Sequence, residues 1–268
     1  MDVAGLARRV LAARAAARRL TPLTRTETGF TLDAAYDVAQ AVLQQRQAAG
    51  EIAIGRKIGF TNRSIWPQYN VGAPIWAHLY DQTVRFATRD SGRQSLTGAL
   101  EPRIEPEIAF KLKRTPPNNA TPAQWLGCIE WVAHAYEIVV SPFPHWRFAA
   151  PDTVAAFGLH GTLIVGTPLP IAQLPKSIDT LANFKITLHC DGKPMAHGGG
   201  AAVLDSPLNT LVHLQALLAT QPNAEPLRAG EIISTGTLTD ALPIKAGQTW
   251  HTTFAGLPLP GLSVEFVQ

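Results

Sequence analysis

Apolar residues recur at three- and four-residue spacing along the first fifty positions of the chain. Over residues 31–49 this spacing predicts an amphipathic helix that ends near Gly50, and an earlier stripe beginning at Val3 predicts a helix before it. The opening twenty residues are rich in alanine and arginine, a composition shared by transit peptides, but the matching second helix favours a structural role. We therefore expect residues 1–50 to form a helical N-terminal section.

Beyond this section the pattern changes to short apolar runs separated by glycine and proline, with 21 of each in the chain. Such runs are typical of many short strands. Alternation over residues 184–190, followed by Asp191 and Gly192, predicts a β-hairpin. One helix is expected at residues 207–218 because its leucines keep helical spacing. The chain is therefore predicted to adopt an α+β fold, with a strand-rich domain at residues 51–268.

Composition excludes several classes of protein. The net charge of +3 is small, and beyond residue 25 lysine and arginine are scattered among acidic residues, so we expect no nucleic-acid partner. Cys128 and Cys190 have neither metal-ligand nor disulfide-framework spacing. No run approaches the roughly 20 apolar residues of a membrane span. A soluble protein of the reducing cytoplasm, with no membrane partner, is the expectation.

Two carboxylates lie two positions apart in the segment EPRIEPEIAFKL, residues 101–112. In an extended chain Glu105 and Glu107 share one face, while the isoleucines beside them point to the other. Pro106 lacks the N–H donor of a regular strand, so this segment is predicted to be an edge or irregular strand.

Neighbouring carboxylates repel each other unless they share a proton, pair with a basic group or bind a hard cation. Two interpretations of the glutamate pair remain open. The pair either lies on a solvated face whose charge Arg103 and Lys111 balance, or it forms a metal site. Glu137 favours the metal site, because it lies among apolar residues in HAYEIVV, where an unpaired carboxylate is costly.

A third polar segment, GRKIGFTN at residues 55–62, places Arg56 and Lys57 between glycines in an apolar setting. One of the two cations is expected to face the site. It could hold a substrate carboxylate, or a lysine with a depressed pKa could transfer protons. Neither this segment nor the GGG at residues 198–200 has the spacing of a nucleotide-binding motif, so no nucleotide cofactor is expected.

With these residues the sequence resembles the 2-keto-4-pentenoate hydratase and 4-oxalocrotonate decarboxylase family of the fumarylacetoacetate hydrolase superfamily. The resemblance covers nearly the whole chain and rests on GRKIGFT, PRIEPEIAF, YEIV, FAAPDTVAAFGLHGTLIVG, SPLNTLVHL and LRAGEIISTGTLTDALPIKAGQT. It implies a mixed, strand-rich fold with a helical N-terminal section.

The resemblance also implies a set of site residues. Mg²⁺ or Mn²⁺ would be held by the two glutamates of the E-x-E motif, Glu105 and Glu107, and by Glu137 downstream. Lys57, the lysine of the G-x-K-I-G segment, would lie near the substrate. Asp81 stands close to the position of a pocket acid in related hydratases, although a surface turn is an equal alternative there.

Two segments depart from the family pattern. Related enzymes continue from the third glutamate as E-I-V-D-S-R, whereas this chain reads EIVVSPFPHW, with Val140 and Pro142 in place of the acid and the base. The polar segment after the DTVA motif is replaced by AFGLHG, which introduces Phe157 and His160. A bulkier or less polar substrate is expected. His160 could act as an acid or base, or form a structural hydrogen bond.

The activity implied by the resemblance is a metal-dependent lyase reaction of aromatic catabolism on a small 2-oxo acid. A hydratase would add water to a 2-hydroxy-2,4-dienoate to give a 4-hydroxy-2-oxo acid. Decarboxylation of 2-oxo-3-hexenedioate, C–C hydrolysis of an acylpyruvate, and a non-catalytic relative that binds an organic acid remain alternatives. The family also implies a homo-oligomer.

Overall fold

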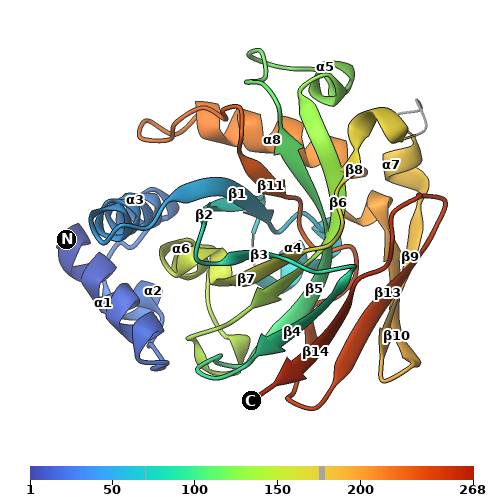
Figure 1. Ribbon diagram of the computed structural model, residues 1–268. Helices are drawn as coiled ribbons and strands as arrows, with labels where there is room; N and C mark the ends of the chain where they lie inside the picture. Colours follow the sequence, from blue (N-terminus) through green and yellow to red (C-terminus); the bar gives the residue numbers. More distant parts are fainter. Residues whose placement is uncertain (70, 175–178) are drawn as a thin grey trace.

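The computed structural model describes residues 1–69, 71–174 and 179–268. Within these ranges the chain forms a nine-stranded and a five-stranded sheet with helices around them (Figure 1). The strands are β1 (Ala53–Gly59), β2 (Ile75–Tyr80), β3 (Val84–Phe86), β4 (Ser91–Ser95), β5 (Arg103–Leu112), β6 (Ile129–Val139), β7 (His160–Val165), β8 (Leu169–Pro170), β9 (Lys185–Cys190), β10 (Lys193–Gly199), β11 (Ile232–Ser234), β12 (Leu242–Pro243), β13 (Thr249–Ala255) and β14 (Ser263–Val267). The helices are α1 (Val3–Ala15), α2 (Leu23–Thr26), α3 (Leu32–Ala48), α4 (Trp66–Tyr69), α5 (Pro122–Leu126), α6 (Ala150–Ala155), α7 (Thr180–Asn183) and α8 (Pro207–Ala219). The predicted α+β fold is confirmed.

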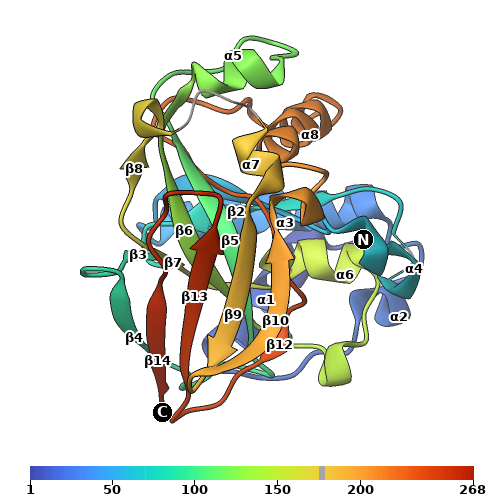
Figure 2. The ribbon, with the colours of Figure 1, turned by 90° about the vertical axis from the view of Figure 1, so that its right-hand side faces the viewer.

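The two sheets pack against each other. The larger one has the strand order β2-β1-β11-β5-β6-β7-β3, with β12 also paired to β5 and β8 to β6, and the smaller one has the order β10-β9-β13-β14-β4. Figure 2 shows the smaller sheet lying over β5 and β6. Tyr136 of β6 shares a buried cluster with Trp250 and Phe266 of the smaller sheet. One face of β5 and β6 is therefore core, and only the other is available for a site.

Helices α1 and α3 form the helical section predicted for the N-terminus. The Thr31 hydroxyl caps α3 by accepting a hydrogen bond from the Ala34 N–H, and Gly50 follows the helix with a φ of +90°. Buried residues of both helices share one apolar cluster with Val139 of β6 and Val154 of α6. The helical section thus packs directly on the strands. The division into two sections near residue 50 stays a prediction.

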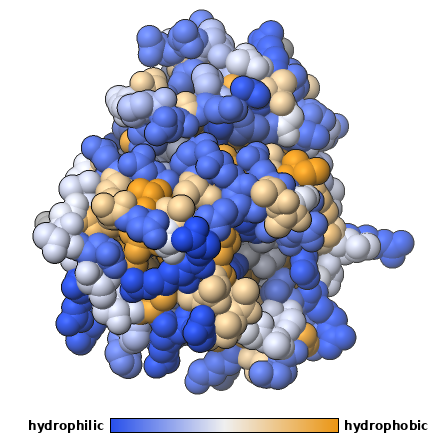
Figure 3. All heavy atoms as spheres, turned by 90° about the vertical axis from the view of Figure 1, so that its left-hand side faces the viewer, coloured by the Kyte–Doolittle hydropathy of each residue, from blue (hydrophilic) through white to orange (hydrophobic). Residues whose placement is uncertain are grey.

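The face that carries α1 and α3 is mostly hydrophilic, and hydrophobic side chains gather on it only in small groups (Figure 3). The apolar residues that predicted these helices, such as Leu6 and Val38, are buried. No helix in the described ranges is long and apolar enough to cross a membrane.

Two predictions for the C-terminal half are confirmed. Strands β9 and β10 form the expected hairpin, and Asp191 and Gly192 between them both have positive φ, as a two-residue turn of this kind requires. Helix α8 follows Ser206, whose hydroxyl accepts a hydrogen bond from the Leu208 N–H.

Strand β5 is internal to the larger sheet, so of the two alternatives predicted for the segment around Pro106 the edge strand is wrong and the irregular strand is confirmed. The reason is an interruption on one side of β5: β11 pairs with residues 109–111 and β12 with residues 103–104. Between these segments the Pro106 carbonyl accepts a hydrogen bond from the Leu238 N–H. Since the nitrogen and carbonyl of a strand residue point the same way, the missing donor faces this interruption. The irregular pairing allows a proline in a central strand.

Candidate active site

The antiparallel pairing of β5 and β6 brings the three predicted glutamates onto one face of the larger sheet. Glu105 lies directly opposite Glu137, and Glu107 projects from the same face two residues further along β5. One oxygen from each carboxyl group lies within 4.8 Å of the others. Ile104 and Tyr136, on the opposite face, point into the core. The alternation of the sequence therefore translates directly into the geometry of the cluster.

Glu107 is fully buried, and its two carboxyl oxygens have different surroundings. Oε2 accepts hydrogen bonds from the Ser234 hydroxyl and, at 3.0 Å, from the Gly236 N–H. Gly236 has a φ of +91°, and a Cβ there would lie 1.9 Å from the Thr61 hydroxyl oxygen, so only glycine fits. Oε1 is buried without a hydrogen-bond partner. A buried acceptor left unpaired is costly, so this oxygen indicates that a ligand binds beside it.

Both carboxyl oxygens of Glu137 are occupied by basic side chains. Lys57 Nζ lies 2.5 Å from Oε2, and His160 Nδ1 lies 2.7 Å from Oε1. All three side chains are buried. The His160 Nε2 lies 2.9 Å from the Thr83 hydroxyl oxygen, which fixes the ring from its other side. This carboxylate is held rigidly, as expected of a group that positions a ligand.

The three carboxyl groups have very different proton affinities. Burial raises the pKa of Glu105 to about 7, with Lys57 opposing and Glu137 adding to the shift. Burial and the charges of its two neighbours raise the pKa of Glu107 well above its usual range. Burial alone would also raise the pKa of Glu137, but Lys57 and the hydrogen bond from His160 outweigh it and lower this pKa to about 2. Without a further cation, Glu105 and Glu107 therefore keep their protons to a higher pH than exposed glutamates do.

Lys57, rather than Arg56, faces the glutamates. The Arg56 guanidinium turns to the other side of β1, where it lies 3.4 Å from Glu231. Burial tends to lower the pKa of Lys57, but the nearby carboxylates, Glu137 first, outweigh it and raise the pKa. The suggestion of a lysine with a depressed pKa is therefore wrong for this arrangement. Lys57 carries its proton and can act as a cation or a proton donor.

His160 and Asp81 occupy different kinds of position. His160 does not line the cavity, and its contact with Glu137 is the structural hydrogen bond that the sequence left as an alternative. Asp81 lies in the turn after β2, where its carboxylate accepts a hydrogen bond from the Ile52 N–H at 3.0 Å. It is absent from the cavity lining. The expectation of a pocket acid at Asp81 is thus corrected to a turn residue.

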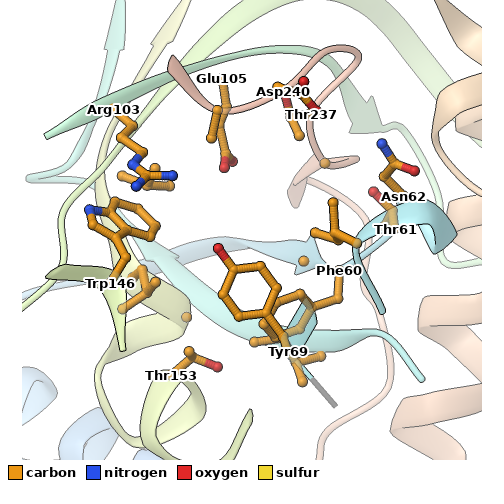
Figure 4. A pocket seen from close by; sticks show the side chains of 18 of the residues that line it. Phe60, Thr61, Asn62, Tyr69, Arg103, Glu105, Trp146, Thr153, Thr237 and Asp240 are labelled. Atoms are coloured by element: carbon orange, nitrogen blue, oxygen red, sulfur yellow. The ribbon is translucent and has the colours of Figure 1, made fainter. Parts of the chain in front are cut away.

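A cavity of about 280 Å³ opens beside the cluster and is lined by Lys57 and Glu105. Figure 4 shows Glu105 pointing into it from one side, near Thr237 and Asp240. Further polar groups of the lining come from the loop after β1, among them Thr61 and Asn62 (Figure 4). Aromatic and aliphatic side chains complete the wall.

Several lining residues were not singled out from the sequence. Thr237 and Asp240 lie in the loop between β11 and β12, within the TGTLTDALP part of a family motif, and Arg103 was considered only as a surface counter-charge. All three are polar residues within an otherwise apolar motif. That pattern shows that they are unusual, but it does not show that their side chains line a cavity.

The departures from the family pattern also lie elsewhere than expected. Val140, Pro142 and Phe157 line a small depression against the N-terminal helices, away from the glutamates. The residues from the same segments that do line the cavity are Trp146 and Leu159, among others. The altered segments therefore shape the cavity through Trp146 and Leu159, and Val140, Pro142 and Phe157 do not contribute to it.

The cluster fits a hard divalent cation. Its donors are carboxylate oxygens, the ligands that Mg²⁺ and Mn²⁺ prefer, and one of them, Glu107 Oε1, has no other partner. A cation would also offset the burial and, after it, the repulsion between carboxylates that raise the pKa values of Glu105 and Glu107. Glu105, Glu107 and Glu137 would hold it.

Comparison with known proteins agrees with this geometry. Residues 80–259 match the family model described as "Fumarylacetoacetate (FAA) hydrolase C-terminal". The chain belongs to the fumarylacetoacetate hydrolase family. The matched range contains the three glutamates, and the region before it holds the N-terminal helices and Lys57.

Among curated members of this family, the chain is 33% identical to the 2-hydroxyhexa-2,4-dienoate hydratase of Comamonas testosteroni, over 90% of this chain and 89% of the relative. It is 30% identical to a 4-oxalocrotonate decarboxylase from a Pseudomonas species, over 92% of both chains. These relatives are lyases that differ in the reaction they catalyse.

A solved structure with the same fold is the 4-oxalocrotonate decarboxylase from Pseudomonas putida G7, complexed with magnesium and adipate. It has a TM-score of 0.90 and 25% identity, and the match covers 99% of this chain and 97% of that one. The helical N-terminal section is thus part of the shared fold.

We expect metal binding to release protons from this cluster. The carboxyl group of Glu105, with its pKa of about 7, must lose its proton to bind a cation, so affinity should rise as the pH increases through that pKa. Calorimetric titration of Mg²⁺ near pH 6.5, in two buffers with different ionisation enthalpies, should show release of about one proton or more per metal. Glu105→Gln should reduce that number. Identical heats in both buffers would contradict the expectation.

Proposed function

We propose that this protein is a divalent-metal-dependent hydratase that adds water to a 2-hydroxy-2,4-dienoate and yields a 4-hydroxy-2-oxo acid. The observation that carries the proposal is the unpaired Oε1 of Glu107 in a three-carboxylate cluster at the wall of a small cavity. Support also comes from relatives named as hydratases of such dienoates. The metal would be Mg²⁺ or Mn²⁺, held by Glu105, Glu107 and Glu137, and the cellular role would be in aromatic catabolism.

The metal supplies a positive charge that makes an adjacent carbonyl a better electron sink. The residues of the chain position it: Ser234 and the Gly236 N–H orient Glu107, and His160 orients Glu137. Each of these contacts fixes a carboxylate before substrate arrives, which lowers the cost of reorganisation during the reaction.

Lys57 has the role of holding the substrate carboxylate or donating a proton to the dienol. Its ammonium group lines the cavity and its pKa is raised, so at neutral pH it offers protons and does not accept them. Protonation of the terminal carbon and loss of the 2-hydroxyl proton to solvent convert the dienol to an unsaturated ketone. Water then adds its hydroxyl group to the fourth carbon and a proton to the third. Thr61, Asn62 and Thr237 provide polar groups along the cavity to orient the acid and the water.

Decarboxylation of 2-oxo-3-hexenedioate is the second candidate, and one observation favours it. Arg103 lines the cavity, and within the described part of the chain its guanidinium donates no hydrogen bond, so it could hold a second carboxylate. A decarboxylase also stands among the similar proteins.

The test uses chelator-stripped protein with 2-hydroxypenta-2,4-dienoate and, separately, 2-oxo-3-hexenedioate, each with and without Mg²⁺ or Mn²⁺. Metal-dependent loss of dienoate absorbance with formation of the hydroxy acid is expected. Release of CO₂ from the diacid without turnover of the dienoate would replace the hydratase by the decarboxylase. We also propose a cytoplasmic homo-oligomer, and light scattering of the purified protein measures its size.

A further inference from the structure

Aromatic rings from three separate segments line the cavity. Phe60 contacts Tyr69 with ring centroids 5.5 Å apart, Tyr69 stacks on Phe148 at 5.2 Å, and Phe148 contacts Trp146 at 6.0 Å. All four rings line the cavity. Figure 4 shows Phe60, Tyr69 and Trp146 across the cavity from Thr237 and Asp240. We call these four residues the aromatic wall.

Trp146 is held in the wall by contacts on two sides. The Arg103 guanidinium lies 4.0 Å from the centre of its ring, and its indole N–H donates a 3.1 Å hydrogen bond to the Glu101 carbonyl. The backbone of His145 and Trp146 adopts positive φ angles of 57° and 56°, which non-glycine residues rarely do. The His145 N–H is tied to the Glu101 carboxylate at 3.2 Å. A strained backbone that is held by several contacts is typical of ligand clamps.

Aliphatic side chains extend the same surface. Ile65, Ile75, Val139 and Leu159 also line the cavity. A five-carbon dienoic acid has its polar groups at one end, and these would be taken up by the cluster and Lys57. Such a substrate would leave the aromatic wall without a partner. The aromatic and aliphatic residues thus give the cavity more apolar lining than a short acid would contact, and Gln68, Arg103 and Thr153 are the polar residues nearby in the lining.

We propose that the aromatic wall is a specificity site for a planar aromatic substituent at the distal end of the 2-oxo acid. This inference rests on the proposed function and names its substrate class. Offset or edge-to-face contacts with Tyr69, Trp146 and Phe148 favour a ring over a methyl group. Arg103, which also lines the cavity, packs on the Trp146 ring and is a positioning residue here.

Binding tests the inference without turnover. Calorimetry in saturating Mg²⁺ compares 2-oxobutanoate, 2-oxo-4-phenylbutanoate and 2-oxoadipate on the wild-type protein. The phenyl acid should bind about tenfold more tightly than 2-oxobutanoate, the gain expected from a ring packed on aromatic neighbours. Trp146→Leu and Phe148→Leu should each reduce that ratio to about threefold or less, by loss of ring contacts. Trp131→Leu, a change to a tryptophan outside the cavity lining, should leave the ratio as it is.

Two results would overturn the inference. One is equal binding of 2-oxobutanoate and the phenyl acid, and the other is preferential binding of 2-oxoadipate, which would assign Arg103 to a second carboxylate. Turnover assays distinguish a failure of the aromatic subsite from a failure of the proposed hydratase function. Hydration of 2-hydroxypenta-2,4-dienoate without a preference for the phenyl acid would leave the hydratase standing and remove the aromatic subsite. Tight, Trp146-dependent binding of the phenyl acid without hydration of the dienoate would support the aromatic subsite and remove the hydratase.

Discussion

Replacing Glu107 with glutamine is expected to abolish metal-dependent turnover and weaken Mg²⁺ binding by at least about a hundredfold. The glutamine amide has no charge and only one oxygen. The Ser234 and Gly236 contacts already use that oxygen, so no charged oxygen is left for the metal. The metal-free protein should keep its stability, because burial already favours the protonated, neutral form of Glu107. Calorimetric Mg²⁺ titration and thermal unfolding with and without Mg²⁺ measure both effects.

Glu130→Gln is the matched control for this variant. Glu130 lies on β6 but is exposed, 3.8 Å from Lys111. Metal affinity and turnover should be those of the wild type. If Glu107→Gln binds Mg²⁺ as tightly as Glu130→Gln does, the three-carboxylate metal site is refuted.

Replacing Lys57 with methionine should cost activity and stability together. The loss in kcat/KM should be about 10²- to 10⁴-fold, the range for removal of a positioned proton donor. The metal-free protein should also lose about 3–5 kcal/mol of unfolding free energy, because the change leaves Glu137 as a buried charge without its ammonium partner. Steady-state kinetics and urea unfolding measure the two losses.

Bound metal should recover part of the lost stability, because it supplies another positive charge to Glu137, whereas it cannot replace the proton of Lys57. Lys111→Met, a change to a half-exposed lysine on β5, is the control and should affect neither quantity strongly. Activity of Lys57→Met within a few-fold of the wild type would show that this lysine is only structural.

The sequence predicted which glutamates form the cluster, but it did not predict most of the residues that surround them. Two-residue alternation was sufficient to place Glu105 and Glu107 on one face, and the cost of an unpaired buried charge identified Glu137. The register that sets Glu105 opposite Glu137 depends on pairing between two strands, which a single strand pattern does not contain. The family resemblance supplied that link.

The errors have physical reasons. A proline in sequence shows a missing donor, but the interruption between β11 and β12 that accommodates Pro106 is a property of the assembled sheet. Asp81 was assigned from a loose local match, and its carboxylate is used to close a turn on Ile52. Trp146 belongs to an irregular segment with left-handed backbone angles, for which apolar periodicity gives no signal.

The contacts of Glu107 have a consequence for biosynthesis. Its partners Ser234 and Gly236 lie 127 and 129 positions further along the chain. A growing polypeptide thus carries all three glutamates long before the groups that orient Glu107 have left the ribosome. Contacts of such long sequence separation close late, after the local hairpins have formed. The contacts that orient Glu107 therefore form only after residues 234–236 have been made, and a metal ion that met the three glutamates before then would find Glu107 without them.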